Sequence, residues 1–362
     1  MILFSFIVST ALLVLFTTFP LWRYEAWWVR SLDFPRLQLS IISLIIIVLE
    51  LALLDSSLLR SWILMIATIA CMAYQSWWIA PYTPFFPVEV KSATDIDRQR
   101  MIRILTANVL ATNRNSNALI KLVNENKPDV LVFLESNKWW QSKLDTLETD
   151  YPYAIKCPQE NLYGMHVYSR LALSDSKIEY LVEPDVPSMH SLVHLSSGQK
   201  IRMHFLHPAP PSPTENEASS ERDAELLIVA KSVCKSDIPV IVTGDLNDVA
   251  WSETTRLFRK ISGLLDPRVG RGMYNTFHAG YWFIRWPLDH LFHSSHFTLS
   301  SLRRLRPFGS DHFAILAELV FEADNELQQR GLKADSDDVA WAQATVDKQD
   351  VGKRDVPQPG SH

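Results

Sequence analysis

The segment Gly244-Asp245-Leu246-Asn247 follows the apolar, β-branched run 238–243, and its residue types could do chemistry. In an extended chain, residues two apart point to the same side, so a strand ending this way presents a carboxylate and a carboxamide together. Asp245 can orient or deprotonate a water molecule, and Asn247 can hold a phosphate oxygen. An ordinary turn after a strand uses the same residue types, so the segment needs support from elsewhere in the chain.

Other apolar runs in the chain also end in polar residues. Polar side chains at the ends of buried strands are typical of an active site along one edge of a sheet. In chain order, the candidates are Asn108, Glu135, His207, Asp245 with Asn247, Asp289 with His290, and Asp311 with His312.

This ordered set resembles the endonuclease/exonuclease/phosphatase superfamily, which includes DNase I-like nucleases, neutral sphingomyelinases and inositol-polyphosphate phosphatases. The resemblance covers roughly residues 102–320, and the segment His207-Pro208-Ala209-Pro210-Pro211 resembles a bacterial, membrane-anchored subgroup. It implies an α/β (α+β) fold, a four-layer, two-sheet β-sandwich flanked by helices, whereas periodicity alone indicates only mixed α and β structure. Leu110 departs from the pattern, because some family nucleases carry a second acidic ligand there.

A phosphoester-cleaving site needs a hard cation on the phosphate oxygens and an activated water molecule. Glu135 is the best candidate ligand for Mg²⁺ (or Mn²⁺), and Asp311 and Asn108 are further candidates. A buried Glu135 held in an ion pair is the structural alternative. Three residues are candidates to bind the substrate phosphate: Asn108, Asn247 and His207.

The expected catalytic groups include a carboxylate–imidazole dyad of Asp289 and His312, in which the carboxylate fixes the ring tautomer. Asp245 and Asn247 would act on the attacking water, and His207 would contact the phosphate or protonate the leaving group. Two neighbouring features are expected to be structural: His290, whose side chain points away from that of Asp289, and the turn at residues 270–272. In the latter, Arg271 could instead touch a phosphate.

Three apolar segments, residues 2–19, 37–54 and 62–80, are each about long enough to cross a bilayer as a helix. The domain organisation we expect is a membrane region with three transmembrane helices (1–80), a polar linker (81–100), the catalytic domain (101–321) and a mostly disordered tail (322–362), with a short helix near 338–346. Buried helices of a soluble domain are the alternative for the apolar segments.

The sequence leaves the side of the membrane open. The loop after the first segment carries Arg23, Arg30 and Arg36, whereas the loop after the second carries only Arg60. The positive-inside rule therefore puts the catalytic domain in the cytoplasm. Resemblance to membrane-bound relatives favours the periplasm instead.

Charge and composition narrow the function less than the motifs do. The net charge of −5 gives no global attraction to nucleic acid, and the three cysteines show no zinc-binding spacing. We expect a multi-pass, membrane-tethered, Mg²⁺-dependent phosphoesterase that contacts the lipid bilayer and has no obligate protein partner. Its phosphoester substrate could be nucleic acid or a phospholipid headgroup, because the aromatic residues at 281–283 and 286 could stack on bases or contact lipid. The alternative is a non-catalytic, membrane-anchored binding module on the same fold.

Overall fold

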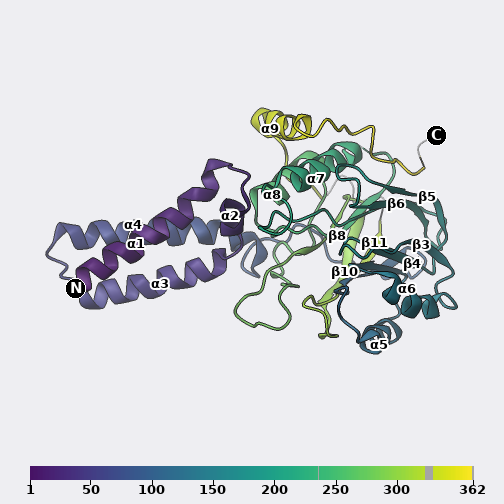
Figure 1. Cartoon of the computed structure of the whole chain (residues 1–362), viewed down its shortest axis with the longest axis horizontal. Helices are drawn as coiled ribbons and strands as arrows, with labels where there is room; N and C mark the ends of the chain where they lie inside the picture. The colour runs from purple at the N-terminus through teal and green to yellow at the C-terminus, as the bar shows by residue number, and fades with distance from the viewer. Residues whose placement is uncertain (235, 323–328, 361–362) are drawn as a thin grey trace.

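The computed structural model describes residues 1–234, 236–322 and 329–360, and it places a bundle of long helices beside a larger layered domain (Figure 1). Three helical segments are long and apolar enough to cross a membrane: Ile2–Trp22, Arg36–Leu53 and Leu59–Tyr82. They contain the helices α1 (Ile2–Thr18), α3 (Arg36–Leu53) and α4 (Leu59–Ile79), with the 3₁₀ turns η1 (Phe19–Trp22) and η3 (Ala80–Tyr82). The short helices α2 (Trp27–Arg30) and η2 (Ser31–Asp33) lie between α1 and α3.

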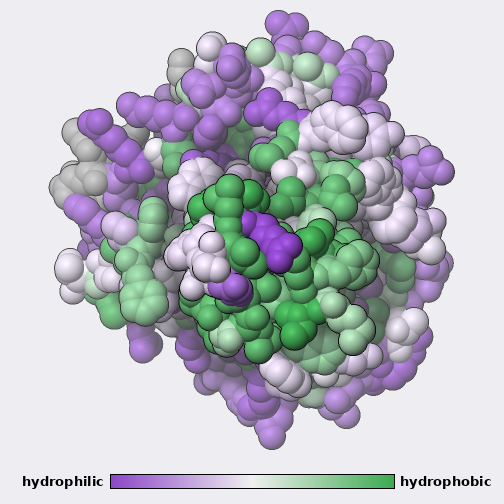
Figure 2. Space-filling model, turned by 90° about the vertical axis from the view of Figure 1, so that its left-hand side faces the viewer, coloured by the Kyte–Doolittle hydropathy of each residue, from purple (hydrophilic) through white to green (hydrophobic). Residues whose placement is uncertain are grey.

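Polar side chains hold the bundle together from inside. Thr10 and Thr68 both donate to Oε1 of the buried Glu50, at 3.3 Å each. Gln75 donates to the Thr17 hydroxyl at 3.1 Å. Hydrogen bonds between helices are a usual source of association where the surroundings are apolar. The outer surface of the bundle is apolar, and Figure 2 shows these side chains gathered at the centre of the face seen from the bundle end.

The domain contains two mixed β-sheets. In the first, the strand order is β10 (Phe297–Arg304), β11 (Ile315–Phe321), β1 (Met101–Asn108), β2 (Val130–Leu134), β4 (Met165–Ser169) and β3 (Tyr153–Cys157). In the second, it is β5 (Leu173–Glu179), β6 (Ser188–His194), β7 (Lys200–Leu206), β8 (Val240–Asp245) and β9 (Asp289–His293). β1 pairs in parallel with β2, and β7 pairs in parallel with β8, so the carboxyl ends of each pair meet at one edge.

Helices cover the outer face of each sheet and complete four layers. Residues such as Ile104, Val132, Met203 and Ile241 fill the core between the sheets. One outer core packs the first sheet against α5 (Ser116–Asn126), α6 (Lys138–Leu144) and η4 (Asp145–Leu147). The other packs the second sheet against α7 (Ser220–Val233), α8 (Glu253–Ser262) and α9 (Ser336–Asp347). The four-layer sandwich and the three long apolar helices are therefore confirmed.

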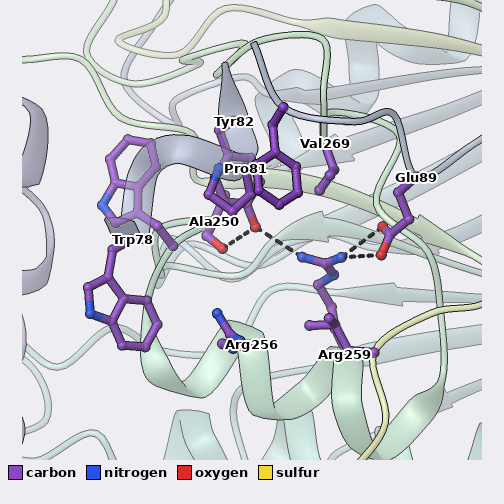
Figure 3. Close-up of a pocket in the computed structure, with 11 residues that line it drawn as sticks. Trp78, Pro81, Tyr82, Glu89, Ala250, Arg256, Arg259 and Val269 are labelled. Atoms are coloured by element: carbon purple, nitrogen blue, oxygen red, sulfur yellow. Dashed lines mark hydrogen bonds and ion pairs between the residues drawn. The ribbon is translucent and has the colours of Figure 1, made fainter. Parts of the chain in front are cut away.

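The segment predicted as a polar linker, residues 81–100, is partly built into the domain. The Tyr82 hydroxyl donates to the Ala250 carbonyl at 2.5 Å, and Arg259 of α8 donates both to that hydroxyl and to the two carboxylate oxygens of Glu89 (Figure 3). Val90 is fully buried in the core between the sheets. Glu89 is held here by a buried cationic partner, which the polar composition of the segment does not reveal.

The tail also differs from the prediction of a mostly disordered segment at 322–362. Within the described residues 329–360, helix α9 packs on α7 and α8, and Ala342 and Val346 contribute to their shared apolar core. Asp335 caps α9 by accepting from the Asp338 amide at 2.9 Å. The expected helix near 338–346 is present, and residues 323–328 and 361–362 of the predicted tail lie outside the described part. The charged composition of this segment does not reveal that Ala342 and Val346 are buried against α7 and α8.

Candidate active site

The two sheets are in direct contact where β1 and β8 approach their carboxyl ends. The hydroxyls of Thr106 and Thr243 lie 2.9 Å apart across the buried contact between the sheets. Two residues further along each strand, where the side chain points the same way, are Asn108 and Asp245. Nδ2 of Asn108 donates to Oδ2 of Asp245 at 3.2 Å. The alternation of side chains along each strand therefore places Asn108 of one sheet beside Asp245 of the other.

Gly244 allows β8 to approach β7 at this point. Its φ is +154°, and a Cβ atom there would lie 1.8 Å from the carbonyl oxygen of Leu206. No other residue fits without moving a strand. In the other direction, β8 pairs with β9 in a register that sets Asp245 directly opposite Asp289.

Asp289 and His312 form a buried pair, with Oδ2 of the aspartate 2.8 Å from Nδ1 of the ring. The other ring nitrogen, Nε2, faces Oδ2 of Asp245 at 3.6 Å, and the Phe277 ring packs 5.0 Å from the imidazole. Burial lowers the pKa of His312, but the two carboxylates more than offset this effect and raise it to about 10. The ring is thus held as an imidazolium between two aspartates.

Glu135 directly follows β2 and has a left-handed backbone, with φ of +56°. Its Oε1 accepts from Nδ2 of Asn108 at 2.7 Å. Its Oε2 is buried and has no hydrogen-bond partner among the described residues. Burial raises the pKa of Glu135 to about 7, although the hydrogen bond from Asn108 opposes the shift. A buried carboxylate oxygen without a donor is suited to a cation.

His207 and Asn247 lie on the side of the site formed by β7 and β8. His207 is buried, which lowers its pKa to about 4, and its ring packs 5.5 Å from Tyr163. Asn247 has φ of +52°, its amide N–H donates to Oδ1 of Asp245 at 3.0 Å, and its Nδ2 donates to the Pro208 carbonyl at 3.0 Å. These contacts fix the loop after β8 against the loop after β7.

Asp311 is half-buried at the edge of the site, and Oδ1 accepts from the Ser310 hydroxyl at 3.3 Å. The same hydroxyl donates to the Asn108 carbonyl at 2.8 Å, so Ser310 ties the loop before β11 to the end of β1. The negative charge of Asp311 raises the pKa of both Glu135 and His312. The structure thus brings all the predicted site residues to the same edge of the sandwich.

Several supporting residues were not found from the sequence. Arg222 of α7 is buried and donates to the Asn247 carbonyl at 2.8 Å while it pairs with Asp223. Arg268 lies 2.7 Å from Nδ1 of His290, whose Nε2 lies 2.9 Å from the Asp248 carbonyl. His290 therefore braces the loop after β8, in agreement with its expected structural role. No sequence pattern connects these residues, and only the adjacency of Asp248 to Asn247 could have drawn attention to the loop.

Two basic features lie away from this edge. Arg271 donates to the Val90 carbonyl at 2.6 Å, in agreement with the structural interpretation of the turn at 270–272. Arg306 pairs with Glu125 of α5 at 2.8 Å. Neither contact leaves the guanidinium directed to the site residues.

One set of metal-ligand types is tightly clustered: atoms of Asp245, Asp289 and His312 lie within 4.8 Å of one another. Nδ1 of His312 is already bonded to Asp289, and Nε2 faces Asp245, so both ring nitrogens are engaged within the cluster. The cluster is better explained as a charged hydrogen-bonded network. The unpartnered Oε2 of Glu135 is the more suitable place for a cation.

A sandwich of this kind, with polar residues from six strand ends at one edge, defines a class of phosphoester-cleaving proteins. The sequence model of the Endonuclease/Exonuclease/phosphatase family matches residues 105–312, which is more than half of the chain. The chain belongs to this family. Family members are hydrolases that act on phosphoester bonds. No curated protein matches the chain.

Solved structures share the fold. The human Nocturnin catalytic domain with a bound sulfate anion aligns with a TM-score of 0.52 and 18% identity, over 62% of this chain and 96% of that chain. TDP2 from D. rerio, complexed with a single-strand DNA product, aligns with 0.50 and 16% identity, over 60% and 98%. An endonuclease/exonuclease/phosphatase from Beutenbergia cavernae aligns with 0.50 and 16% identity, over 62% and 72%. At this identity the likeness concerns the fold alone.

Proposed function

We propose that the protein is a membrane-tethered, Mg²⁺-dependent (or Mn²⁺-dependent) phosphoesterase that hydrolyses phosphodiester or phosphomonoester bonds. The observation that carries this proposal is the pair of buried networks at one sheet edge, with Glu135 and Asn108 on one side of Asp245 and the His312–Asp289 dyad on the other. Burying this many ionisable groups costs stability, which a purely structural role does not explain.

Glu135 would hold the metal ion, with Asn108 and Asp311 as further ligands. The unpartnered Oε2 of Glu135 and the pKa of Glu135, which burial raises, fit this role. A cation would supply the positive charge that a buried carboxylate needs. When bound, the ion would supply charge neutralisation at the non-bridging phosphate oxygens.

Two residues would carry out the proton transfers, Asp245 as the base and His312 as the acid. Burial raises the pKa of Asp245, so it can accept the proton of a water molecule as the water oxygen bonds to phosphorus. The bond from phosphorus to the leaving oxygen breaks, and the imidazolium of His312 is the acid that can protonate that oxygen. Transfer of the proton from Asp245 to His312, across 3.6 Å, restores both groups. Asp289 keeps Nε2 of the ring directed inwards by binding Nδ1.

His207 and Asn247 would contact the phosphate. The low pKa of His207 means that its ring is neutral near pH 7, so it would donate one N–H to a phosphate oxygen and not serve as the acid. The sulfate in Nocturnin and the DNA product in TDP2 are in keeping with an anionic, phosphate-like ligand for this fold.

Purified full-length protein, tested with Mg²⁺ on DNA, RNA, sphingomyelin and inositol phosphates, would test the proposal. Glu135→Gln should raise the Mg²⁺ concentration needed for turnover. Glu225→Gln is the matched control, because Glu225 is also buried and its Oε1 has no partner among the described residues, but it lies in α7 and outside the site. Full activity in chelator would refute the metal role. Binding without turnover of any substrate would favour the non-catalytic binding module.

A further inference from the structure

A cavity of about 460 Å³ lies between the membrane region and the edge of the active site. Arg30, Phe34 and Pro35, from the loop between α1 and α3, line one side of it. Leu288 and Trp286, which precede β9, line the other together with the loop after β7. This volume lies in the usual range of small-molecule sites.

The cavity reaches the residues of the proposed site. Asn247, which is hydrogen-bonded through its amide to Asp245, forms part of the cavity wall. Trp286 stacks on Phe277 with ring centroids 6.2 Å apart, and Phe277 in turn packs 5.0 Å from the His312 ring. A molecule in the cavity would therefore be next to the groups that perform the chemistry.

The cavity also lies at the level where the membrane helices begin. Pro35 immediately precedes α3, and the Phe34 and Trp286 rings pack edge to face at 5.4 Å. Gln38, in the first turn of α3, donates to the Phe283 carbonyl at 2.9 Å. The loop between α8 and β9 that contains Phe283 lies on the bundle side of the domain (Figure 1).

Aromatic side chains project from the same loop. Tyr281, Trp282 and Phe283 are 53%, 81% and 53% exposed. Aromatic rings with a polar group are favoured at the boundary between lipid and water. Since the loop is bonded to the start of α3, these rings lie where a bilayer surface would be.

The lining of the cavity is largely apolar. Phe34, Pro35 and Leu288 provide apolar surface. Arg30 is only 4% exposed, and its Nε atom is enclosed by the protein. The wall is polar where Asn247 lines it, on the side of the proposed site. A ligand that matches this lining has an apolar chain and a polar end directed to Asn247.

We propose that this cavity binds the apolar chain of a phosphoester drawn from the lipid bilayer, and presents its phosphate to the site beside Asn247. The inference rests on the proposed function and names its substrate class. A nucleic acid strand would need cationic groups along its backbone, and the basic side chain in this wall is the single, buried Arg30, which faces Glu253 at 4.0 Å. A lipid-like ester needs only the apolar surface described above and a polar end beside Asn247.

The test uses the full chain in lipid nanodiscs with Mg²⁺. The two substrates, methyl and dodecyl 4-nitrophenyl phosphate, share one phosphate group and differ only in the length of the alkyl chain. Ser31→Trp narrows the cavity from its exposed rim. Ser142→Trp is the matched control, because both serines are exposed and each donates to the carbonyl of a tryptophan three residues earlier. Ser142 lies on α6, outside the cavity lining.

We expect Ser31→Trp to lower kcat/KM for the dodecyl ester by at least about tenfold, since several buried methylene groups are lost from contact. The value for the methyl ester should stay within about twofold of the unchanged protein, and Ser142→Trp should alter neither value. Partition of the dodecyl ester into the nanodisc is the same for all variants, so it cannot produce this difference. Equal values for the dodecyl ester in Ser31→Trp and the unchanged protein would overturn the inference while leaving the proposed function in place.

A binding measurement separates failure of the inference from failure of the proposed function. Dodecyl phosphate with a diazirine on its chain should label residues 30–35 or 284–288 in the unchanged protein, and labelling should fall at least about fivefold in Ser31→Trp. Hydrolysis of neither ester, with this labelling intact, would refute the phosphoesterase but retain the lipid cavity. Labelling elsewhere, or labelling equal in both proteins, would refute the cavity.

Discussion

Residue His312 is buried between two aspartates, and this setting explains its chemistry. In water an imidazole loses its proton near pH 6.5, whereas here the carboxylates of Asp289 and Asp245 raise the pKa to about 10. The burial of all three groups makes each charge depend on the others. Removing one charge should therefore disturb the site more than the loss of one contact would suggest.

The first prediction concerns this dyad. Asp289→Asn and His312→Gln should each lower kcat by on the order of 10²–10⁴-fold, because the ring loses its orientation or its proton. The double variant should be hardly slower than either single variant, since the two groups act as a unit. Losses that multiply in the double variant would show that His312 contacts the phosphate independently. His194→Gln, which removes a half-buried histidine bonded to Ser174, should keep full activity.

The second prediction concerns Glu225, a buried residue of α7. Burial, together with the nearby charge of Glu183, raises its pKa from 4.5 to about 8. Between these two values the folded chain keeps a proton that the unfolded chain releases, so stability falls as the pH rises from about 5 to about 8. Glu225→Gln stays neutral and should remove this loss, a gain of roughly 2–5 kcal/mol above pH 8.

Thermal unfolding of Glu225→Gln and the unchanged protein, measured across this range of pH, gives the test. The difference in Tm should be small near pH 5 and should grow up to about pH 8. A difference that is constant with pH would mean that Glu225 does not hold a proton in the folded state.

At the scale of elements, the strands were the predictable part of this protein. The apolar run predicted to end in Asn108 is β1 as observed, because a buried strand needs a continuous apolar sequence that shows in any local window. The same pattern predicts which polar residues lie at strand ends: Glu135 and His207 directly follow such runs, and Asn108 and Asp245 end them. Arg222, Arg268 and Phe277 were not predictable, because their roles depend on contacts between elements distant in sequence.

The end of β8 provides the third prediction. Gly244→Ala would place a Cβ 1.8 Å from the Leu206 carbonyl, so β7 or β8 must shift, at a cost of about 3 kcal/mol or more. The apparent Tm should fall by at least roughly 6 °C, and activity should fall further because Asp245 is adjacent. Gly198→Ala is the control: its φ is also positive, at +86°, but a Cβ there has open space, so it should cost only about 1 kcal/mol. Equal effects of the two substitutions would show that crowding at Gly244 is unimportant.

At the scale of the whole molecule, the bundle and the domain are joined at more than the chain connection. The loop between α1 and α3 touches the domain, because the Trp27 amide donates to the Glu217 carbonyl at 3.0 Å and Nε1 of Trp251 donates to the Asp33 carbonyl at 2.8 Å. The loop between α3 and α4 has no comparable contact within the described residues. Three membrane crossings would account for this arrangement, since the first loop and the domain would then share one side.

The positive-inside count is ambiguous in this structure. Arg30 lies 4.0 Å from Glu253, Arg36 pairs with Asp33, and Arg23 lies over the Trp341 ring at 4.3 Å. Arg23 and Arg30 contact the domain, and Arg36 also donates to Gln75 within the bundle, so the number of these charges does not report orientation alone.

The last prediction uses a thiol that the protein already has. Cys234 is exposed in the domain, and Cys71 is buried in the bundle. In a Cys157→Ser background, Cys234 should react with a membrane-impermeant maleimide on one side of the membrane only. A second protein, with Cys234→Ser and Ser57→Cys, places the thiol in the exposed loop between α3 and α4, and it should react only on the opposite side. Of the three helices, only α4 lies between position 57 and Cys234. Reaction of both thiols on the same side would therefore mean that α4 does not cross the membrane.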